Sequence, residues 1–174
     1  EIAGRVAADS PLGTAGSPVV VEPIHSCERR SRCRDGETNL CPSLQLIGSH
    51  RPGGFAEAVV VPASSVHLLP PGIDLDTAVL AEPLAVAVHG VGRVAVGRGV
   101  EVLVLGGGTI GLLTTFVLAE SGCVVTTAVR HAHQRDMALN FGATRVVGAE
   151  REAVLEATRG HSPELVFETV GGQA

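Results

Sequence analysis

The 174-residue chain contains no Lys, Trp or Tyr, and aromatic residues make up only 2% of it. All 13 basic residues are therefore Arg. The most basic stretch, residues 29–34, has no aromatic side chains beside it on which nucleic-acid bases could stack. The sequence thus predicts no nucleic-acid partner. It also predicts a core built from Val, Leu and Ala, since so few aromatic side chains are available to fill it.

Long uncharged runs are scarce as well. Residues 102–119 carry no charge, and their number is at the lower end for a membrane-spanning helix. Three consecutive glycines, Gly106 to Gly108, divide this run into a strand-like and a helix-like half. The first residues also lack the charged-then-apolar pattern of a secretory signal. We therefore expect a cytoplasmic protein without a membrane partner.

The apolar pattern changes near residue 80. Before it, short runs broken by Gly and Pro predict a mainly β region with strands at 19–21 and 58–61. Residues 76–94 have helical spacing, and Pro83 is expected near the start of a helix, where its missing N–H costs little. Further strands are predicted at 102–105, 124–128, 145–147 and 164–167, with helices at 110–121, 134–141 and 151–158 between them. Such alternation indicates a parallel sheet with right-handed crossovers. We therefore expect two domains, 1–80 and 81–174.

A glycine-rich motif follows the first of these later strands. Gly106, Gly108 and Gly111 form G-x-G-x-x-G between a predicted strand and a predicted helix. Gly106 allows a tight turn, Gly108 allows a diphosphate to approach, and Gly111 allows close packing. The backbone from Gly108 through Thr109 and Ile110 would present N–H groups to that diphosphate at the positive end of the helix dipole. The motif predicts dinucleotide binding; the alternative is an ordinary glycine-rich turn.

The end of the second strand predicts which nicotinamide cofactor is preferred. A carboxylate there would bind the ribose 2′-hydroxyl and repel a 2′-phosphate. Here Val129 or Arg130 occupies that position, and the first acidic residue, Asp136, falls inside the next predicted helix. Arg130, assisted by His131, could instead bind a 2′-phosphate, which favours NADP over NAD. The alternative is that Arg130 is an ordinary surface residue.

Three of the four cysteines are close together in sequence. Cys27, Cys33 and Cys41 lie in one arginine-rich stretch, whereas Cys123 is distant. Without a secretory signal, this clustering favours a metal site over disulfides.

Four motifs in order resemble the zinc-containing medium-chain dehydrogenases, above all the sorbitol, threonine and butanediol dehydrogenases. They are the cysteine stretch 27–42, residues 53–57 (GGFAE), residues 82–87 (EPLAVA) and the glycine motif, which together cover nearly the whole chain. The resemblance implies an incomplete α/β Rossmann-type doubly wound parallel sheet, preceded by part of a mainly-β GroES-like catalytic domain. The family fold needs about twice this length, so we expect an internal piece of a longer protein.

The resemblance also implies a structural zinc lobe with cysteines spaced C-x₂-C-x₂-C-x₇-C. Cys27, Cys33 and Cys41 match three of its positions, but Arg30 stands at the second. A guanidinium cannot ligate zinc, which prefers four ligands in structural sites. Nothing in the spacing makes His25 a substitute. The lobe is therefore either a three-cysteine zinc site or a loop with free thiols.

For the catalytic zinc, the resemblance implies that Glu1 is the glutamate of a Gly-His-Glu motif. It implies that Glu82 is the glutamate of the E-P-L motif. Glu82 would then have a catalytic role; otherwise it is an acid that stabilises a helix start. The implied activity is hydride transfer between NAD(P) and a secondary alcohol or polyol, by a homo-oligomer when full length. The alternatives are a zinc-independent reductase of quinones or activated alkenes and an inactive nucleotide-binding fragment.

Overall fold

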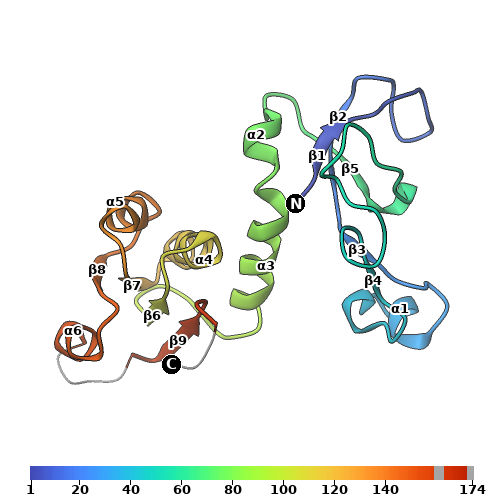
Figure 1. Ribbon diagram of the computed structural model, residues 1–174. Coiled ribbons are helices and arrows are strands. Elements are labelled where there is room, and N and C mark those ends of the chain that lie inside the picture. The colour runs from blue at the N-terminus through green and yellow to red at the C-terminus, as the bar shows by residue number, and fades with distance from the viewer. Residues whose placement is uncertain (159–162, 172–174) are drawn as a thin grey trace. The chain divides into compact units, whose positions relative to one another are not determined.

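The computed structural model describes residues 1–158 and 163–171, and the chain divides into two compact units, Glu1–Glu82 and Pro83–Ala174. Figure 1 shows that each unit has strands of its own. The strands of the first unit pair antiparallel, and those of the second pair parallel.

The first unit is built from short strands. A three-stranded sheet has the order β1-β2-β5, and a separate pair is formed by β3 and β4. The strand predicted at 19–21 is confirmed as β2, in which Val19 and Val21 are buried. The elements of this unit are β1 (Ala3–Arg5), β2 (Pro18–Val21), β3 (Ile24–His25), α1 (Ser31–Arg34), η1 (Thr38–Leu40), β4 (Gln45–Leu46), η2 (Ala63–Ser65), β5 (Val66–Leu68) and α2 (Leu75–Ala78).

The strand predicted at 58–61 is wrong. These residues form no strand, and the side chain of Val60 is fully exposed. Three consecutive Val residues have a high tendency to form a strand, but they become one only where a partner strand accepts their hydrogen bonds.

The helical spacing over 76–94 is divided between two helices, α2 and α3 (Ala81–Val91), and Pro83 lies near the start of α3, as expected. Pro83 explains the break. Its missing N–H and its ring are incompatible with a continuous helix through the preceding turn, but they are tolerated near a helix start.

The second unit holds one parallel four-stranded sheet with the order β8-β7-β6-β9. The strands predicted after residue 100 are confirmed to within one residue at each end, and the helices to within two. The elements are β6 (Glu101–Leu105), α4 (Thr109–Glu120), β7 (Val124–Val129), α5 (Ala132–Asn140), β8 (Arg145–Gly148), α6 (Arg151–Ala157) and β9 (Leu165–Glu168).

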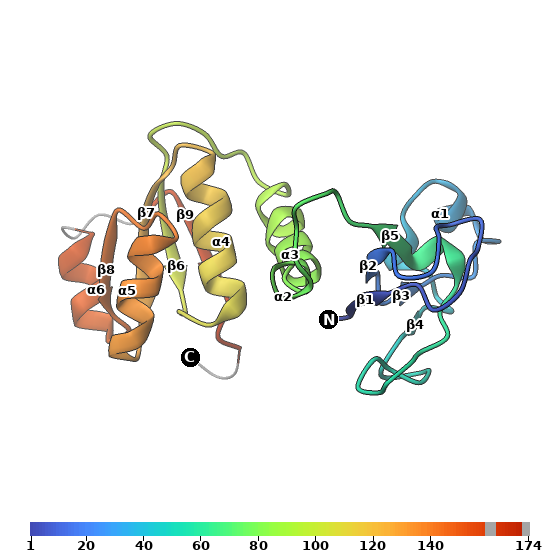
Figure 2. The same ribbon diagram turned by 90° about the horizontal axis from the view of Figure 1, so that it is seen from above.

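This strand order places the crossover helices on both faces of the sheet. Right-handed crossovers put α4 and α5 on one face, and the return from β8 to β9 puts α6 on the other. Figures 1 and 2 show this arrangement. The order reverses beside β6, as in doubly wound nucleotide-binding sheets, whose ligands bind at the carboxyl ends of the strands at that point. The fold is therefore an incomplete Rossmann-type sheet that follows a mainly-β unit.

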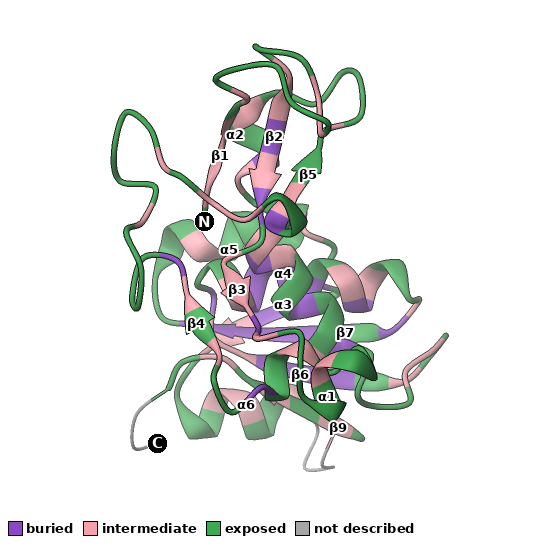
Figure 3. Ribbon diagram, turned by 90° about the vertical axis from the view of Figure 1, so that its right-hand side faces the viewer, coloured by how far each residue is buried: buried purple, intermediate pink, exposed green. Residues whose placement is uncertain are grey.

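The core of the second unit lies between β6, β7 and α4 (Figure 3). Val102, Val104, Val125 and Leu118 are at most 2% exposed, so the strands and the helix bury apolar side chains against one another. The uncharged run 102–119 is thus shared between a strand and a helix, with the glycine turn between them. In the described part of the chain, no helix has the length and apolar character needed to cross a membrane.

Candidate functional site

The glycine motif forms the turn between β6 and α4. Gly106 has a φ of 115°, a backbone conformation that residues with a side chain rarely adopt. A Cβ there would lie 2.6 Å from Oγ1 of Thr169. The N–H of Gly106 donates to the carbonyl of Ala128 at 2.9 Å, which fixes the turn at the end of the neighbouring strand β7. Position 106 therefore requires glycine for both conformation and space.

The other two glycines of the motif have opposite surroundings. A Cβ on Gly111 would lie 2.0 Å from the carbonyl oxygen of Gly106, so no larger residue fits. By contrast, no atom of the described chain lies within 4 Å of the position that a Cβ on Gly108 would take. Gly108 is exposed at the N-cap of α4, and Thr109 and Ile110 follow it in the first turn. Their N–H groups are among those left without partners inside a helix, so they can hydrogen-bond an anion at this edge.

Thr169 also takes part in the turn, a role that sequence analysis did not predict. Its hydroxyl donates to the carbonyl of Leu105 at 2.8 Å and occupies the space left by Gly106 and Gly111. Thr169 follows β9, so this contact joins two neighbouring strands at the carboxyl edge of the sheet. Only a pattern search for a small hydroxyl residue at the end of the fourth strand could have suggested it.

Gly107 is the second residue that sequence analysis missed. It is buried, and a Cβ on it would lie 2.8 Å from Cγ1 of Val129 and 2.9 Å from Cβ of Gln134. The glycine turn therefore packs directly against the segment from the end of β7 to the first turn of α5. This segment contains Val129 and Arg130, which are expected to discriminate between the two cofactors.

The structure separates the environments of those two candidates. Val129 is the last residue of β7 and is 6% exposed, whereas Arg130 is exposed in the turn before α5. Next to Arg130, the rings of His131 and His133 are stacked, with centroids 5.6 Å apart and planes 7° from parallel. Asp136 lies inside α5, as predicted. Arg130 is thus the exposed residue of this turn whose positive charge could bind a 2′-phosphate.

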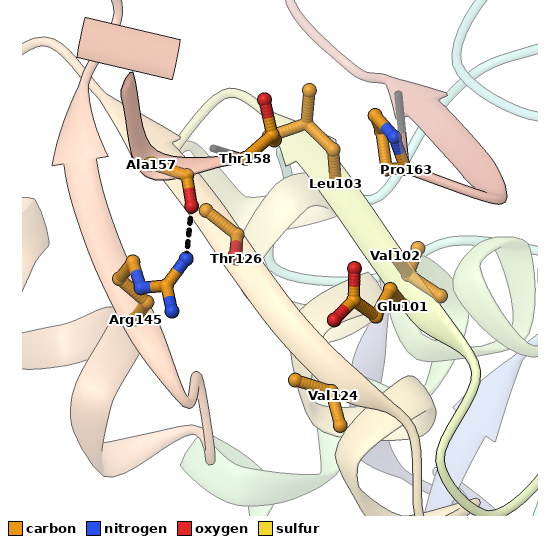
Figure 4. A pocket seen from close by; sticks show the side chains of 9 residues that line it. All are labelled: Glu101, Val102, Leu103, Val124, Thr126, Arg145, Ala157, Thr158 and Pro163. Carbon is orange, nitrogen blue, oxygen red and sulfur yellow. Dashed lines mark hydrogen bonds between the residues drawn. The ribbon is translucent and has the colours of Figure 1, made fainter. Parts of the chain in front are cut away.

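A cavity of about 360 Å³ in the second unit lies elsewhere (Figure 4). Its lining includes Glu101, Val124 and Arg145, which are the first residues of β6, β7 and β8. Arg145 donates a hydrogen bond to the carbonyl of Ala157 beside it. The cavity is therefore at the amino edge of the sheet, whereas the glycine turn is at the carboxyl edge.

The three clustered cysteines meet in the first unit. Sγ of Cys27 lies 3.8 Å from Sγ of Cys33 and 3.5 Å from Sγ of Cys41, and none of them is in a disulfide. Sulfur ligands at the usual Zn–S distance of roughly 2.3 Å stand about 3.8 Å apart in a tetrahedron. These two distances are close to that spacing and all three sulfurs lie within 4.8 Å of one another, so they could hold a metal ion together, in agreement with the expected metal cluster.

Backbone groups around this cluster donate hydrogen bonds to its sulfurs and favour the charged form of Cys27. The N–H groups of Cys27 and Ser43 each donate to Sγ of Cys41 at 3.4 Å. Backbone hydrogen bonds from Arg29 and Arg30 lower the pKa of the Cys27 thiol to about 6. Desolvation raises the pKa of the Cys33 thiol. Zinc binds thiolates, so a first ligand is available near neutral pH.

A fourth ligand is not found within the described residues. The only group there with three or more His, Cys, Asp or Glu side chains close enough to share a metal is Cys27, Cys33 and Cys41. Arg30 is exposed at the N-cap of α1, where the resemblance would place a fourth cysteine. Glu1 is exposed and Glu82 is half-buried in the first turn of α3. Neither glutamate belongs to such a group.

Comparison with known proteins extends these observations. Residues 1–71 match the alcohol dehydrogenase GroES-like domain. Over 161 residues, 91% of the chain, it is 34% identical to 2-dehydro-3-deoxy-L-galactonate 5-dehydrogenase from Pseudoalteromonas atlantica and covers 47% of that protein. It is 31% identical to sorbitol dehydrogenase from Halalkalibacterium halodurans, with 90% of the chain and 48% of the relative covered. The chain belongs to the zinc-type medium-chain alcohol dehydrogenase family.

Structural similarity agrees with this assignment. The crystal structure of a dehydrogenase from Sinorhizobium meliloti, proposed to bind zinc and bound to NADP, is 36% identical and has a TM-score of 0.83. The match covers 91% of this chain and 48% of that one. The chain thus spans about half the length of the medium-chain dehydrogenases that it matches.

Proposed function

We propose that the protein to which this chain belongs is a zinc-assisted oxidoreductase that transfers a hydride between NADP and a secondary alcohol or polyol. The observation that carries the proposal is the turn between β6 and α4. An anion can approach Gly108 at a helix start, and Gly107 next to it packs on Val129, the residue before the exposed Arg130. The relatives named as sorbitol and galactonate dehydrogenases support the substrate class. The NADP-bound neighbour supports the cofactor.

Each part of the chain has a proposed task in this reaction. The backbone of Gly106, Gly108 and Gly111, with Thr109 and Ile110, holds the cofactor diphosphate. Val129 closes the turn from the buried side, and Arg130 binds the 2′-phosphate through charge-assisted hydrogen bonds. The protein thereby orients the cofactor, which carries the redox chemistry. We propose the boundary between the catalytic and cofactor domains at residues 80 and 81.

Two zinc sites are proposed, with different tasks. Cys27, Cys33 and Cys41 would hold a structural ion, for which their geometry is suitable. Glu1 and Glu82 would contribute carboxylates to the catalytic ion, with Glu82 acting at the reacting end of the site. When bound there, zinc would act as a Lewis acid on the substrate oxygen. Two carboxylates alone do not make a zinc site, so the remaining ligands would come from elsewhere in the protein.

We infer a cytoplasmic location, since three neighbouring free thiols suit a reducing compartment. We also infer that the full-length protein is a homo-oligomer, as the family resemblance implies.

Calorimetric titration of the chain with NADPH and NADH separately tests the proposal. NADPH should bind more tightly, and Arg130→Ala should weaken NADPH by about tenfold or more while NADH changes little. Arg151→Ala, at the exposed first residue of α6, is the matched control. Zinc analysis of the full-length protein separates zinc-assisted chemistry from a zinc-independent reductase. If neither cofactor binds, the assignment of the second unit as a cofactor domain is wrong.

A further inference from the structure

We propose that Gln134 is a positioning residue that holds the turn between β7 and α5, so that Arg130 faces the ribose end of the cofactor. Gln134 would thereby set the preference for NADPH over NADH without touching the 2′-phosphate itself. The inference rests on the proposed cofactor-binding function.

The first observation is a shared hydrogen-bond acceptor. Oε1 of Gln134 accepts from the backbone N–H of Arg130 at 3.2 Å and from that of His131 at 3.1 Å. An amide oxygen has two lone pairs, so it can accept both. Two consecutive peptide groups are thus tied to one side chain from the first turn of α5. Because these peptides carry the side chain of Arg130, their orientation determines where the guanidinium can reach.

The second observation is a contact with the glycine turn. Cβ and Cδ of Gln134 lie 2.9 Å and 3.1 Å from the position that a Cβ on Gly107 would take. The stem of Gln134 therefore packs on the middle glycine of the motif while its oxygen holds the next turn. One side chain contacts both segments that the proposed function assigns to the cofactor. Gln134 is half-buried, whereas its neighbours His133 and Arg135 are exposed.

An alternative role for Gln134 is to cap the first turn of α5 and nothing more. Capping alone would change the stability of α5 and would weaken all ligands of the site alike. A positioning role predicts something different. Losing the acceptor should weaken ligands that carry a 2′-phosphate much more than ligands that lack it.

The test uses 2′,5′-ADP and 5′-AMP, which differ only by that phosphate and report on the adenosine end alone. Gln134→Met removes the acceptor but keeps an unbranched side chain against Gly107 and a good helix former. We expect 2′,5′-ADP to bind about tenfold more weakly, and 5′-AMP to change by less than about twofold. Asn140→Met, at the far end of α5, is the matched control and should leave both affinities unchanged.

A second variant keeps the acceptor. Gln134→Glu retains an oxygen at the same reach, so hydrogen exchange at the N–H groups of Arg130 and His131 should stay slow, as in the wild type. In Gln134→Met both N–H groups should exchange faster. If Gln134→Glu loses this protection too, the oxygen does not hold the turn and the inference is wrong.

The remaining outcomes separate this inference from the proposed function. If the wild type binds 2′,5′-ADP and Gln134→Met weakens both ligands by the same factor, the cofactor site stands and the positioning role is overturned. If the wild type binds neither ligand, the proposed cofactor function fails, and the role of Gln134 fails with it.

Discussion

The hydroxyl of Thr115 in α4 lies 2.9 Å from the hydroxyl of Thr127 in β7, and both side chains are fully buried. Thr115 also donates to the carbonyl of Gly111 at 2.9 Å. The single hydroxyl proton of Thr115 is used in its bond to Gly111. In the bond between the two hydroxyls, Thr127 is therefore the donor and Thr115 the acceptor. This two-step chain of hydrogen bonds ties the third glycine of the motif to the second strand.

The direction of these bonds predicts unequal effects of removing each hydroxyl. Thr115→Val leaves the buried hydroxyl of Thr127 without an acceptor and should lower the free energy of unfolding by about 1–3 kcal/mol. Thr127→Val leaves no donor unpaired and should cost less. The double variant should be more stable than Thr115→Val alone. Urea unfolding of the three variants measures this, and equal losses in both single variants would contradict the assigned direction.

Gly111 and Gly108 should separate stability from cofactor binding. Gly111→Ala would place a Cβ 2.0 Å from the carbonyl oxygen of Gly106, so we expect a loss of at least about 2 kcal/mol in stability. Gly108→Ala meets no neighbouring atom and has an ordinary φ of −78°. It should change stability by less than about 0.5 kcal/mol but weaken NADPH, because its methyl group points where a diphosphate would approach. Unchanged NADPH binding in Gly108→Ala would place the diphosphate elsewhere.

Arg30→Cys should complete the cysteine cluster. It restores the C-x₂-C-x₂-C-x₇-C spacing and adds a fourth sulfur in place of a positive charge. Zinc affinity, measured by competition with a coloured chelator, should rise by about tenfold or more. Arg30→Ser, which removes the charge without adding a sulfur ligand, is the control. If both variants bind zinc equally, position 30 does not reach the metal.

Stability at low pH should depend on Asp74. Its carboxylate accepts the backbone N–H of Thr77 at 2.7 Å and the hydroxyl of Thr77 at 3.1 Å. The backbone hydrogen bond is the main reason that the pKa of Asp74 is lowered in the folded chain. Because the folded pKa is below the unfolded one, this stabilisation is complete above the unfolded pKa, about 4, and is lost as pH falls through the folded pKa.

Urea midpoints of the wild type and Asp74→Asn between pH 2 and pH 7 test this dependence. The difference between the two proteins should be constant above about pH 5 and should shrink below about pH 4. A difference that stays constant down to pH 2 would show that the carboxylate charge contributes nothing at the start of α2.

The elements of the second unit could be predicted because their signals are local. Val-rich and Leu-rich runs, the glycine turn and helical spacing are all contained within windows of a few residues. The first unit was harder. The run 58–61 has the composition of a strand, but whether it pairs depends on partners elsewhere in the chain. Pro83 was correctly placed near a helix start, yet its effect on the preceding turn was overlooked.

The candidate site shows the same division. The sequence by itself determined the glycine motif, the absence of an acid directly at the end of β7 and the three-cysteine spacing, since each is a pattern of neighbouring residues. Only the tertiary structure decided that Thr169 fills the space beside Gly106, and that Gln134 joins the glycine turn to Arg130. These contacts form because parallel strands bring their carboxyl ends to one edge, where residues far apart in sequence pack together.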